Sequence, residues 1–265
     1  MNNLKNDSVY LLKSGEYSLD LLNEKSKDIV IDLEVNSLSS ILVSGIKDAK
    51  SLTINVGDSN YLTVSFLLDT ILLNPLKIVI NVNNNSNVNV YFAEFSKDNL
   101  SLDCEINLLK ENAAAYVRLA SLSSHHDDKK INVSINHLVP KTYGKVDNYG
   151  VCKDMGKLLF AGTSHIYEKA FKSKTEQNAK IMVFDEASDA IAKPILKIDE
   201  NDIEASHAAA VGKINDEHLF YLTGRGLSIN DAKELITFGY LKPVLAGFNK
   251  QETKDYISSL IERRM

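Results

Sequence analysis

The sequence predicts a mainly β fold, in which a long region of short strands is followed by a small α-helical region at the C-terminus. Apolar and polar residues alternate in short segments through most of the chain, which is the period of a half-buried strand. Glycine and proline are sparse, with 12 Gly and 4 Pro in 265 residues, which argues against many tight hairpins. After about Gly212 the alternation gives way to helical spacing.

The predicted strands are separated by breaks rich in Asn, Asp and Ser. They cover residues 29–35, 51–56, 61–67, 77–82, 87–95, 102–108, 116–122, 130–138, 157–161 and 180–184. A long run of such strands fits a sandwich, a barrel or a stacked β-helix. The Asn-rich stretch 81–89 favours the β-helix, because Asn tolerates the left-handed backbone of coil corners and can stack its amides from coil to coil. An ordinary polar loop is the alternative explanation of that stretch.

Two helices are expected directly after the strands. Ser228 and Asp231 form a Ser-x-x-Asp helix start, and apolar residues at helical spacing follow it. A shorter helix precedes this one, capped by Asn215 or Asp216 and ended by a glycine.

A third helix is expected to begin at Asn249 and Glu252. It ends with Arg263 and Arg264, which suit the negative end of the helix dipole. A helical region this small cannot bury a core of its own, so its apolar faces must pack on the β region or on a partner. The expected division of the chain is an N-terminal segment at 1–28, a β-helix core at 29–214 and a C-terminal helical region at 215–265.

Composition and missing motifs exclude several functions. The net charge is −5 and no long basic stripe is present, so nucleic acid is not an expected partner. No apolar run approaches the roughly 20 residues of a membrane span. The sequence contains no phosphate-binding loop, no Gly-x-Gly-x-x-Gly, no Cys-x-x-Cys and no His-Glu-x-x-His, so we expect neither a nucleotide-driven enzyme nor a zinc site.

The cysteines and the densest group of potential metal ligands favour structural roles. Cys104 and Cys152 cannot form a disulfide framework, which indicates the cytoplasm, and we expect both to be buried and unreactive. Residues 125–128 read His-His-Asp-Asp. Adjacent residues of an extended chain point to opposite faces, so we expect a solvated turn there rather than a metal site.

The most specific motif lies in residues 198–240. Its characteristic residues are Ser206, His207, Gly212, Ile214, Leu219, Phe220, Tyr221, Arg225, Gly226, Leu227, Ala232 and Gly239. The motifs before it are HLVP at 137–140, YGV at 149–151, FAG at 160–162, TEQN at 175–178 and PILKI at 194–198. Through these residues the chain resembles the SufB/SufD family of iron-sulfur cluster assembly proteins over about 131–239.

The resemblance implies a right-handed parallel β-helix with a small C-terminal α-helical region. It also implies a non-enzymatic, cytoplasmic scaffold. In the family, a SufB and a SufD subunit pair through their β-helix cores, and each C-terminal helical region docks the ATPase SufC. The resemblance therefore implies a transient iron-sulfur cluster at the subunit interface and no tightly bound cofactor in the lone chain. A homodimer is the alternative assembly of the chain in isolation.

Within the family, His207 favours a SufD-like chain. A SufB would carry Glu at that position and a cysteine some thirty residues earlier, and residues 173–183 contain no cysteine. The chain resembles a short form that lacks most of the family's N-terminal helical domain. The resemblance makes His207 the candidate residue for cluster assembly, as a ligand or proton acceptor, since a neutral imidazole can bind iron. On its own, a lone His is more often a hydrogen-bonded structural residue.

The C-terminal helical region supplies the candidate ATPase-docking residues. They are Phe220, Tyr221, Arg225, Leu235, Ile236, Phe238 and Tyr240. Aromatic and arginine side chains are common at interface centres. The alternative is that the apolar members form the core of the helical region, and both can hold on different faces of the same helices.

A carbohydrate-active or adhesive β-helix is the competing interpretation. Its acid and base would be drawn from Asp185, Glu186 and Asp189. The sequence has no tryptophan, and that function leaves the C-terminal helices without a purpose.

Overall fold

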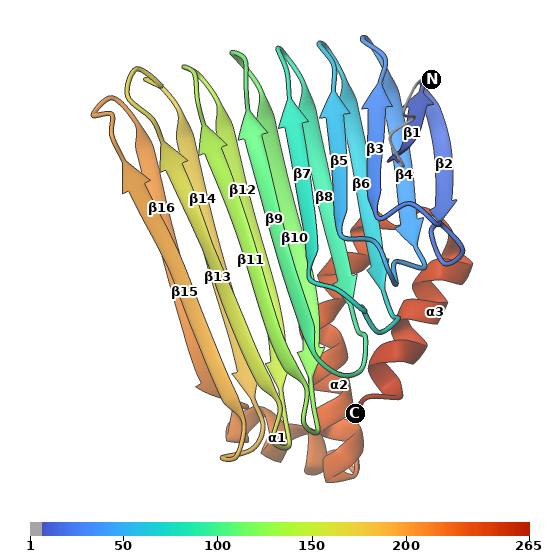
Figure 1. The fold of residues 1–265 in the computed structure, drawn as a ribbon. Helices are drawn as coiled ribbons and strands as arrows, with labels where there is room; N and C mark the ends of the chain where they lie inside the picture. Colours follow the sequence, from blue (N-terminus) through green and yellow to red (C-terminus); the bar gives the residue numbers. More distant parts are fainter. Residues whose placement is uncertain (1–6) are drawn as a thin grey trace.

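The computed structural model describes residues 7–265 and shows two parallel sheets of eight strands each, joined into a β-helix (Figure 1). One sheet contains the odd-numbered strands, β1 (Asp7–Leu12), β3 (Asp28–Leu33), β5 (Ser51–Val56), β7 (Leu76–Val82), β9 (Leu100–Leu108), β11 (Asp128–His137), β13 (Lys157–Ile166) and β15 (Asp189–Ile198). The other contains β2 (Gly15–Asp20), β4 (Leu38–Ser44), β6 (Tyr61–Leu68), β8 (Asn87–Glu94), β10 (Ala114–Ser123), β12 (Tyr143–Cys152), β14 (Lys174–Val183) and β16 (Glu204–Lys213). The predicted mainly β fold with a parallel β-helix is confirmed.

Alternate residues of each strand fill the space between the two sheets. Leu52, Ile54 and Val56 of β5 are buried, while the residues between them are half-exposed. Each coil adds one strand to each sheet, so these apolar residues stack on those of the next coil. The period of two in the sequence is therefore the period of the β-helix core.

The β-helix widens toward its C-terminal end. Asn55 hydrogen-bonds Asp32 of the preceding coil, 23 residues earlier, whereas Asn178 bonds Asp147, 31 residues earlier. The strands also lengthen from 6 residues in β1 to 10 in β16. The last coils consequently present the broadest cross-section of the molecule (Figure 1).

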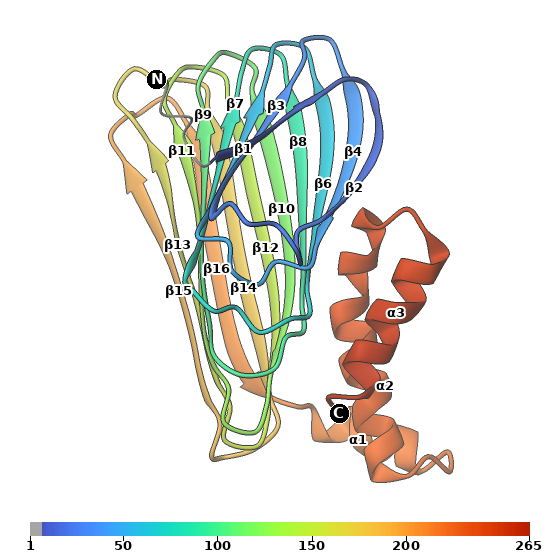
Figure 2. The same cartoon turned by 45° about the vertical axis from the view of Figure 1, so that its right-hand side comes forward.

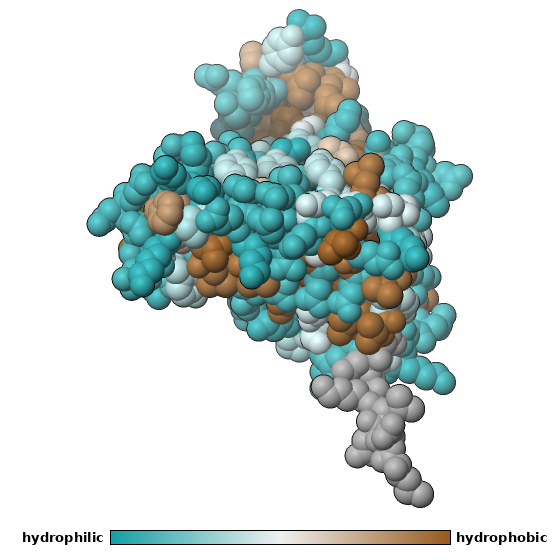
Figure 3. All heavy atoms as spheres, turned by 90° about the horizontal axis from the view of Figure 1, so that it is seen from above, coloured by the Kyte–Doolittle hydropathy of each residue, from teal (hydrophilic) through white to brown (hydrophobic). Residues whose placement is uncertain are grey.

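The Asn-rich stretch has both of the structural roles expected for it. Asn85 has a φ of 53° at a coil corner and accepts a hydrogen bond from Asn112, at 2.9 Å. On the strands, Asn81 donates to Asn55 at 2.8 Å, and Asn107 donates to Asn81 at 3.1 Å. The corner turns that face the viewer in Figure 3 are mostly hydrophilic, with separate hydrophobic patches between them.

Strands begin at β1, earlier than the first one expected at residue 29. β1 and β2 lie within the predicted N-terminal segment 1–28 and pair in parallel with β3 and β4. Tyr10 and Tyr17 pack against the core from these strands. Their alternation is short and mixed with charged residues, which is why the sequence pattern missed it. Residues 1–6 of the predicted segment lie outside the described residues.

Four further strands were also missed: β4, β12, β15 and β16. Gly144 and Gly150 weaken the β signal in β12, and four of the ten residues of β16 are alanine. Pro194 lies inside β15, which is an edge strand of its sheet, where the missing N–H is tolerated.

The helical region comprises α1 (Asp216–Thr223), α2 (Ile229–Leu241), the 3₁₀ helix η1 (Lys242–Gly247) and α3 (Gln251–Glu262). Asn215 caps α1 and Ser228 caps α2 through their side chains, as expected. Asn249 does not cap α3: its side chain donates to Glu16 and Ser40, at 3.0 and 3.2 Å, and the capping position belongs to Lys250. The predicted start at Asn249 was wrong because this amide is used to tie the helical region to the first coils.

The helical region packs on the outer face of the second sheet (Figure 2). Val244, Ile257 and Ile261 are buried there against Leu67 and Leu122. The apolar faces of the helices are therefore covered in part by the β-helix, as the small size of this region requires.

Candidate functional site

His207 lies on β16, at the C-terminal end of the β-helix. β14 is the only strand that pairs with β16 among the described residues. In the register of this pair, His207 lies beside Gln177, which is an inward-facing, buried residue of β14. His207 shares that orientation and is exposed, because no strand of residues 7–265 follows β16.

The last coil exposes side chains that are buried in the coil before it. Leu158 and Phe160 of β13 are 1% exposed, whereas their register partners on β15, Ala190 and Ala192, are half-exposed. On β16, Val211 lies in the inward-facing register and is 46% exposed. The inner side of β15 and β16 is therefore an open apolar end, which we call the terminal coil face.

Small residues surround His207 on β16. Ala208, Ala209 and Ala210 follow it directly, and all three are exposed. A Cβ atom built on Gly212 would meet no atom within 4 Å. No contact within the described chain requires these residues to be small, so another backbone can approach β16 closely.

Polar side chains lie inside the β-helix directly behind the terminal coil face. Gln177 donates a hydrogen bond to Ser164 at 2.7 Å, and both are buried. At the rim, His165 bonds the carboxylate of Asp199 at 2.6 Å and stacks on Tyr167, with 3.5 Å between the ring centroids. The hydrogen bond from His165 lowers the pKa of Asp199. The sequence pattern does not reveal this pair, because its members are 34 residues apart and meet only when the coils stack.

Both cysteines are buried and free. Burial raises the pKa of the Cys104 thiol, and it raises the pKa of Cys152 to about 11. The thiolate is the metal-binding and nucleophilic form, so neither residue is prepared for either role. The expectation of buried thiols is confirmed.

The His-His-Asp-Asp segment forms a turn, but one member is not solvated. His125 has a φ of 57° and an exposed ring at 3.0 Å from Asp154. Asp127 is buried and forms an ion pair with Arg264 of the C-terminal region. The expectation of a wholly solvated turn was wrong because the helical region covers this corner of the β-helix. Arg264 lies just beyond the C-terminal end of α3, as expected, and its side chain also reaches Asp127.

The candidate docking residues divide into two groups. Phe220 is 80% exposed, Tyr221 is 56% exposed and Leu235 is 51% exposed. Arg225 lies over the ring of Tyr221, with its guanidinium carbon 4.4 Å from the ring centroid. No residue of α1 is buried. These four exposed residues lie on α1, in the loop that follows it and on α2, and we call them together the α1–α2 surface.

The other three residues pack on the β-helix. Ile236, Phe238 and Tyr240 are partly buried against the cluster beneath the helical region. Tyr240 meets Tyr149 of β12 edge to face, at 5.6 Å between centroids, and burial raises its pKa to about 12. Phe238 also lines an open groove of about 680 Å³ between α2 and α3. The interpretation as packed core is therefore confirmed for these three residues, and ATPase docking stays a prediction for the exposed ones.

Two of the three carboxylates of the competing interpretation, Glu186 and Asp185, are engaged in other contacts. Glu186 binds Lys213 at 3.0 Å, and this contact lowers the pKa of Glu186, which disfavours its use as an acid. Asp185 accepts the backbone N–H of Asp154 at 2.7 Å. Across residues 7–265, no group of three or more His, Cys, Asp and Glu side chains is arranged to hold a metal ion. None of the helices in that range is both long and apolar enough to cross a bilayer.

These features define a parallel β-helix protein with an open terminal coil and a helical region packed on one sheet. Residues 35–240 match the family described as SUF system FeS cluster assembly, SufBD core domain. The chain belongs to this family. The matched residues include most of the β-helix, His207, α1 and nearly all of α2.

Similar curated proteins include a SufD and a SufB. The chain is 33% identical to the iron-sulfur cluster assembly protein SufD of Bacillus subtilis over 137 residues, which is 52% of this chain and 31% of SufD. It is 29% identical to SufB of the same organism over 140 residues, 53% of this chain and 29% of SufB. An iron-sulfur cluster assembly SufBD family protein of Staphylococcus epidermidis is 26% identical over 149 residues, 56% of this chain and 31% of that protein. The matched part thus spans about a third of each relative.

Proposed function

We propose that this chain is a SufD-like scaffold subunit of the SUF iron-sulfur cluster assembly machinery. It pairs with a SufB-like subunit through the terminal coil face and docks a SufC-like ATPase through its helical region. The observation that carries the proposal is the exposure of inward-facing residues on β15 and β16, where the preceding coil is closed.

The terminal coil face favours a partner that is itself a β-helix end. β15 and β16 each have one strand edge without a neighbour among the described residues, and such an edge is a template for further strand pairing. The half-buried Ala192, Pro194 and Leu196 offer apolar area between the two edges. A second β-helix stacked here would bury both the edges and the apolar side chains.

The position of His207 supports a role in cluster assembly. It belongs to the face that the partner covers, and its imidazole can bind iron or accept a proton. The lone chain offers no neighbouring thiolate, since Cys104 and Cys152 are buried. The cluster is therefore a substrate, and most of its ligands come from the partner. This chain supplies the interface that holds the partner and the side chain of His207.

The α1–α2 surface supports ATPase docking. Phe220 and Tyr221 expose aromatic area that nothing in the described chain covers. Arg225 extends this surface over Tyr221. Aromatic and arginine side chains dominate the energetics of protein interfaces, so this surface suits a protein partner.

The test is co-expression of the chain with SufB-like and SufC-like proteins, followed by affinity purification. Ala209→Lys places a charge on the inward-facing side of β16, and Ala208→Lys places the same charge on the outward side. We expect Ala209→Lys to lose the SufB-like partner and keep the ATPase, and Ala208→Lys to retain both. Equal retention of the SufB-like partner by the two variants would contradict pairing through the terminal coil face.

A further inference from the structure

Two opposite charges lie inside the β-helix where the coils call for apolar side chains. Lys129 of β11 is paired in register with Leu100 on one side and Leu158 on the other. Glu94 of β8 follows Leu68 of the preceding coil in register. Both side chains are 0% exposed.

The two side chains form an ion pair with each other, and the ammonium also hydrogen-bonds one backbone carbonyl. The ammonium of Lys129 donates to both carboxylate oxygens of Glu94, at 2.8 Å each, and to the carbonyl oxygen of Ser96 at 2.8 Å. Glu94 also accepts from the hydroxyl of Ser121, and from the hydroxyl and N–H of Ser96 at 2.6 and 3.1 Å. Every proton of the ammonium therefore has an acceptor.

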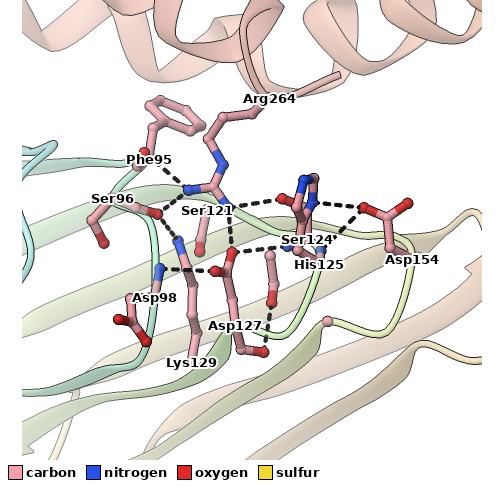
Figure 4. A network of polar contacts seen from close by, with 12 residues as sticks. Phe95, Ser96, Asp98, Ser121, Ser124, His125, Asp127, Lys129, Asp154 and Arg264 are labelled. Atoms are coloured by element: carbon pink, nitrogen blue, oxygen red, sulfur yellow. Dashed lines mark hydrogen bonds and ion pairs between the residues drawn. The ribbon is translucent and has the colours of Figure 1, made fainter.

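The same Ser96 carbonyl accepts a hydrogen bond from Arg264, which lies two residues beyond the end of α3 (Figure 4). The guanidinium also binds the carboxylate of Asp127 and donates to the hydroxyl of Ser124 at 2.9 Å. Asp127 in turn accepts the N–H of Asp98 at 2.8 Å, in the loop that carries Ser96. Arg264 thus contacts the loop of Ser96 and Asp98 in two ways, directly through the Ser96 carbonyl and indirectly through Asp127.

The buried pair is not explained by the stability of the coil. An ion pair in a protein interior is often no more stabilising than apolar side chains of similar size, because desolvation offsets the attraction. The register partners of Lys129 on the two adjacent strands are both leucines, so apolar residues fill the equivalent positions of those coils. An apolar pair would not hydrogen-bond the Ser96 carbonyl, and so would not hold that carbonyl in the orientation in which it accepts from Arg264.

We propose that Glu94 and Lys129 are positioning residues that hold the Ser96 carbonyl for Arg264, and thereby fix the orientation of the C-terminal helical region on the β-helix. The inference concerns the chain alone and does not depend on the identity of any partner. The Glu94–Lys129 pair and the Arg264 contacts act as one unit, which we call the clasp.

The experiment uses the full chain and hydrogen–deuterium exchange of α3 and β11. The near-isosteric double variant Glu94→Gln/Lys129→Met removes both charges, and Arg264→Met removes the guanidinium. We expect each variant to speed α3 amide exchange about tenfold while β11 exchange stays at the wild-type rate. The triple variant should show no further increase, because the residues act through one contact.

A second measurement reads orientation directly. Spin labels at Glu252→Cys and Lys197→Cys report the distance between α3 and β15, and both native cysteines are buried and do not compete. The double variant should broaden this distance distribution relative to wild type. As a matched control, Lys77→Met/Glu105→Gln removes a surface ion pair of 3.4 Å and should change neither readout.

Two results would overturn the proposal. One is wild-type α3 exchange and an unchanged distance distribution in the double variant. The other is loss of protection in β11 together with α3, or failure of the double variant to fold, because either would make the pair a stability element of the coil itself.

Discussion

Gln177 and His207 are register partners on adjacent strands, yet Gln177 is 4% exposed and His207 is exposed. The difference arises because, within residues 7–265, β14 has a strand on each side and β16 has one on a single side. His207 thus occupies an inward-facing position on the outermost coil of the described residues. This is the physical basis of the proposed pairing.

Replacement of His207 by alanine is predicted to abolish cluster maturation without unfolding the chain. The side chain is exposed, so its loss should change the free energy of unfolding by no more than about 0.5 kcal/mol. His126→Ala, at an exposed histidine of the turn before β11, is the matched control. Activity of an iron-sulfur enzyme in cells and the melting temperature of each variant give the readout. Normal maturation in the His207→Ala strain would refute a chemical role for this residue.

Phe220 and Tyr240 are predicted to respond oppositely to truncation. Phe220→Ala should weaken ATPase binding and leave stability within about 0.5 kcal/mol of wild type, because the ring is 80% exposed. Tyr240→Ala should lower the free energy of unfolding by about 2 kcal/mol, because it removes a partly buried ring packed on Tyr149. Denaturant titration and ATPase pull-down separate the two effects. The α1–α2 surface would be the wrong docking site if Phe220→Ala bound the ATPase as wild type does.

The burial of His137 is predicted to lower the free energy of unfolding in mild acid. This side chain is buried, with Nδ1 2.8 Å from the hydroxyl of Thr142, and burial lowers its pKa from 6.5 to about 4. The unfolded chain therefore takes up this proton first as the pH falls. The contribution is fully present above pH 6.5, is lost between pH 6.5 and 4, and amounts to about 3 kcal/mol. Denaturant titrations across this range should show the decline, and His137→Asn should flatten it. Equal slopes for the two proteins would show that His137 is not responsible.

The two cysteines are predicted to resist thiol reagents in the folded chain. Both are buried, and burial raises the pKa of each thiol. Reaction with a chromogenic disulfide at pH 8 should be negligible until denaturant is added, and two equivalents should then react. Rapid reaction of the native protein would mean that the β-helix opens at one of these positions.

Much of the β-helix follows from the sequence because alternate burial leaves a direct pattern. The segments at 51–56 and 77–82 become β5 and β7 with almost the same bounds. The pattern misses β1, β2, β4 and β12, and it also misses both strands of the open last coil. There β16 is rich in alanine and β15 contains Pro194, so neither looks like a buried strand. These are the strands that form the terminal coil face.

The alternation of apolar and polar residues does not predict contacts between segments that are far apart in the sequence. Arg264 looked like a residue at a helix end, and Asp127 looked like part of a solvated turn. They are 137 residues apart and meet only when the helical region packs on the β-helix. In contrast, helical spacing predicts which residues lie on an apolar helix face, but it does not say which face the β-helix covers. The predicted docking residues therefore include both the exposed Phe220 and the packed Tyr240.

Native mass spectrometry of the complex purified from the source cell through a tag on this chain tests the central claim most directly. The account predicts an assembly that contains this chain, a SufB-like subunit and a SufC-like ATPase, and predicts that Ala209→Lys releases the SufB-like subunit. Recovery of the chain only by itself, or only as copies of itself, would contradict the claim.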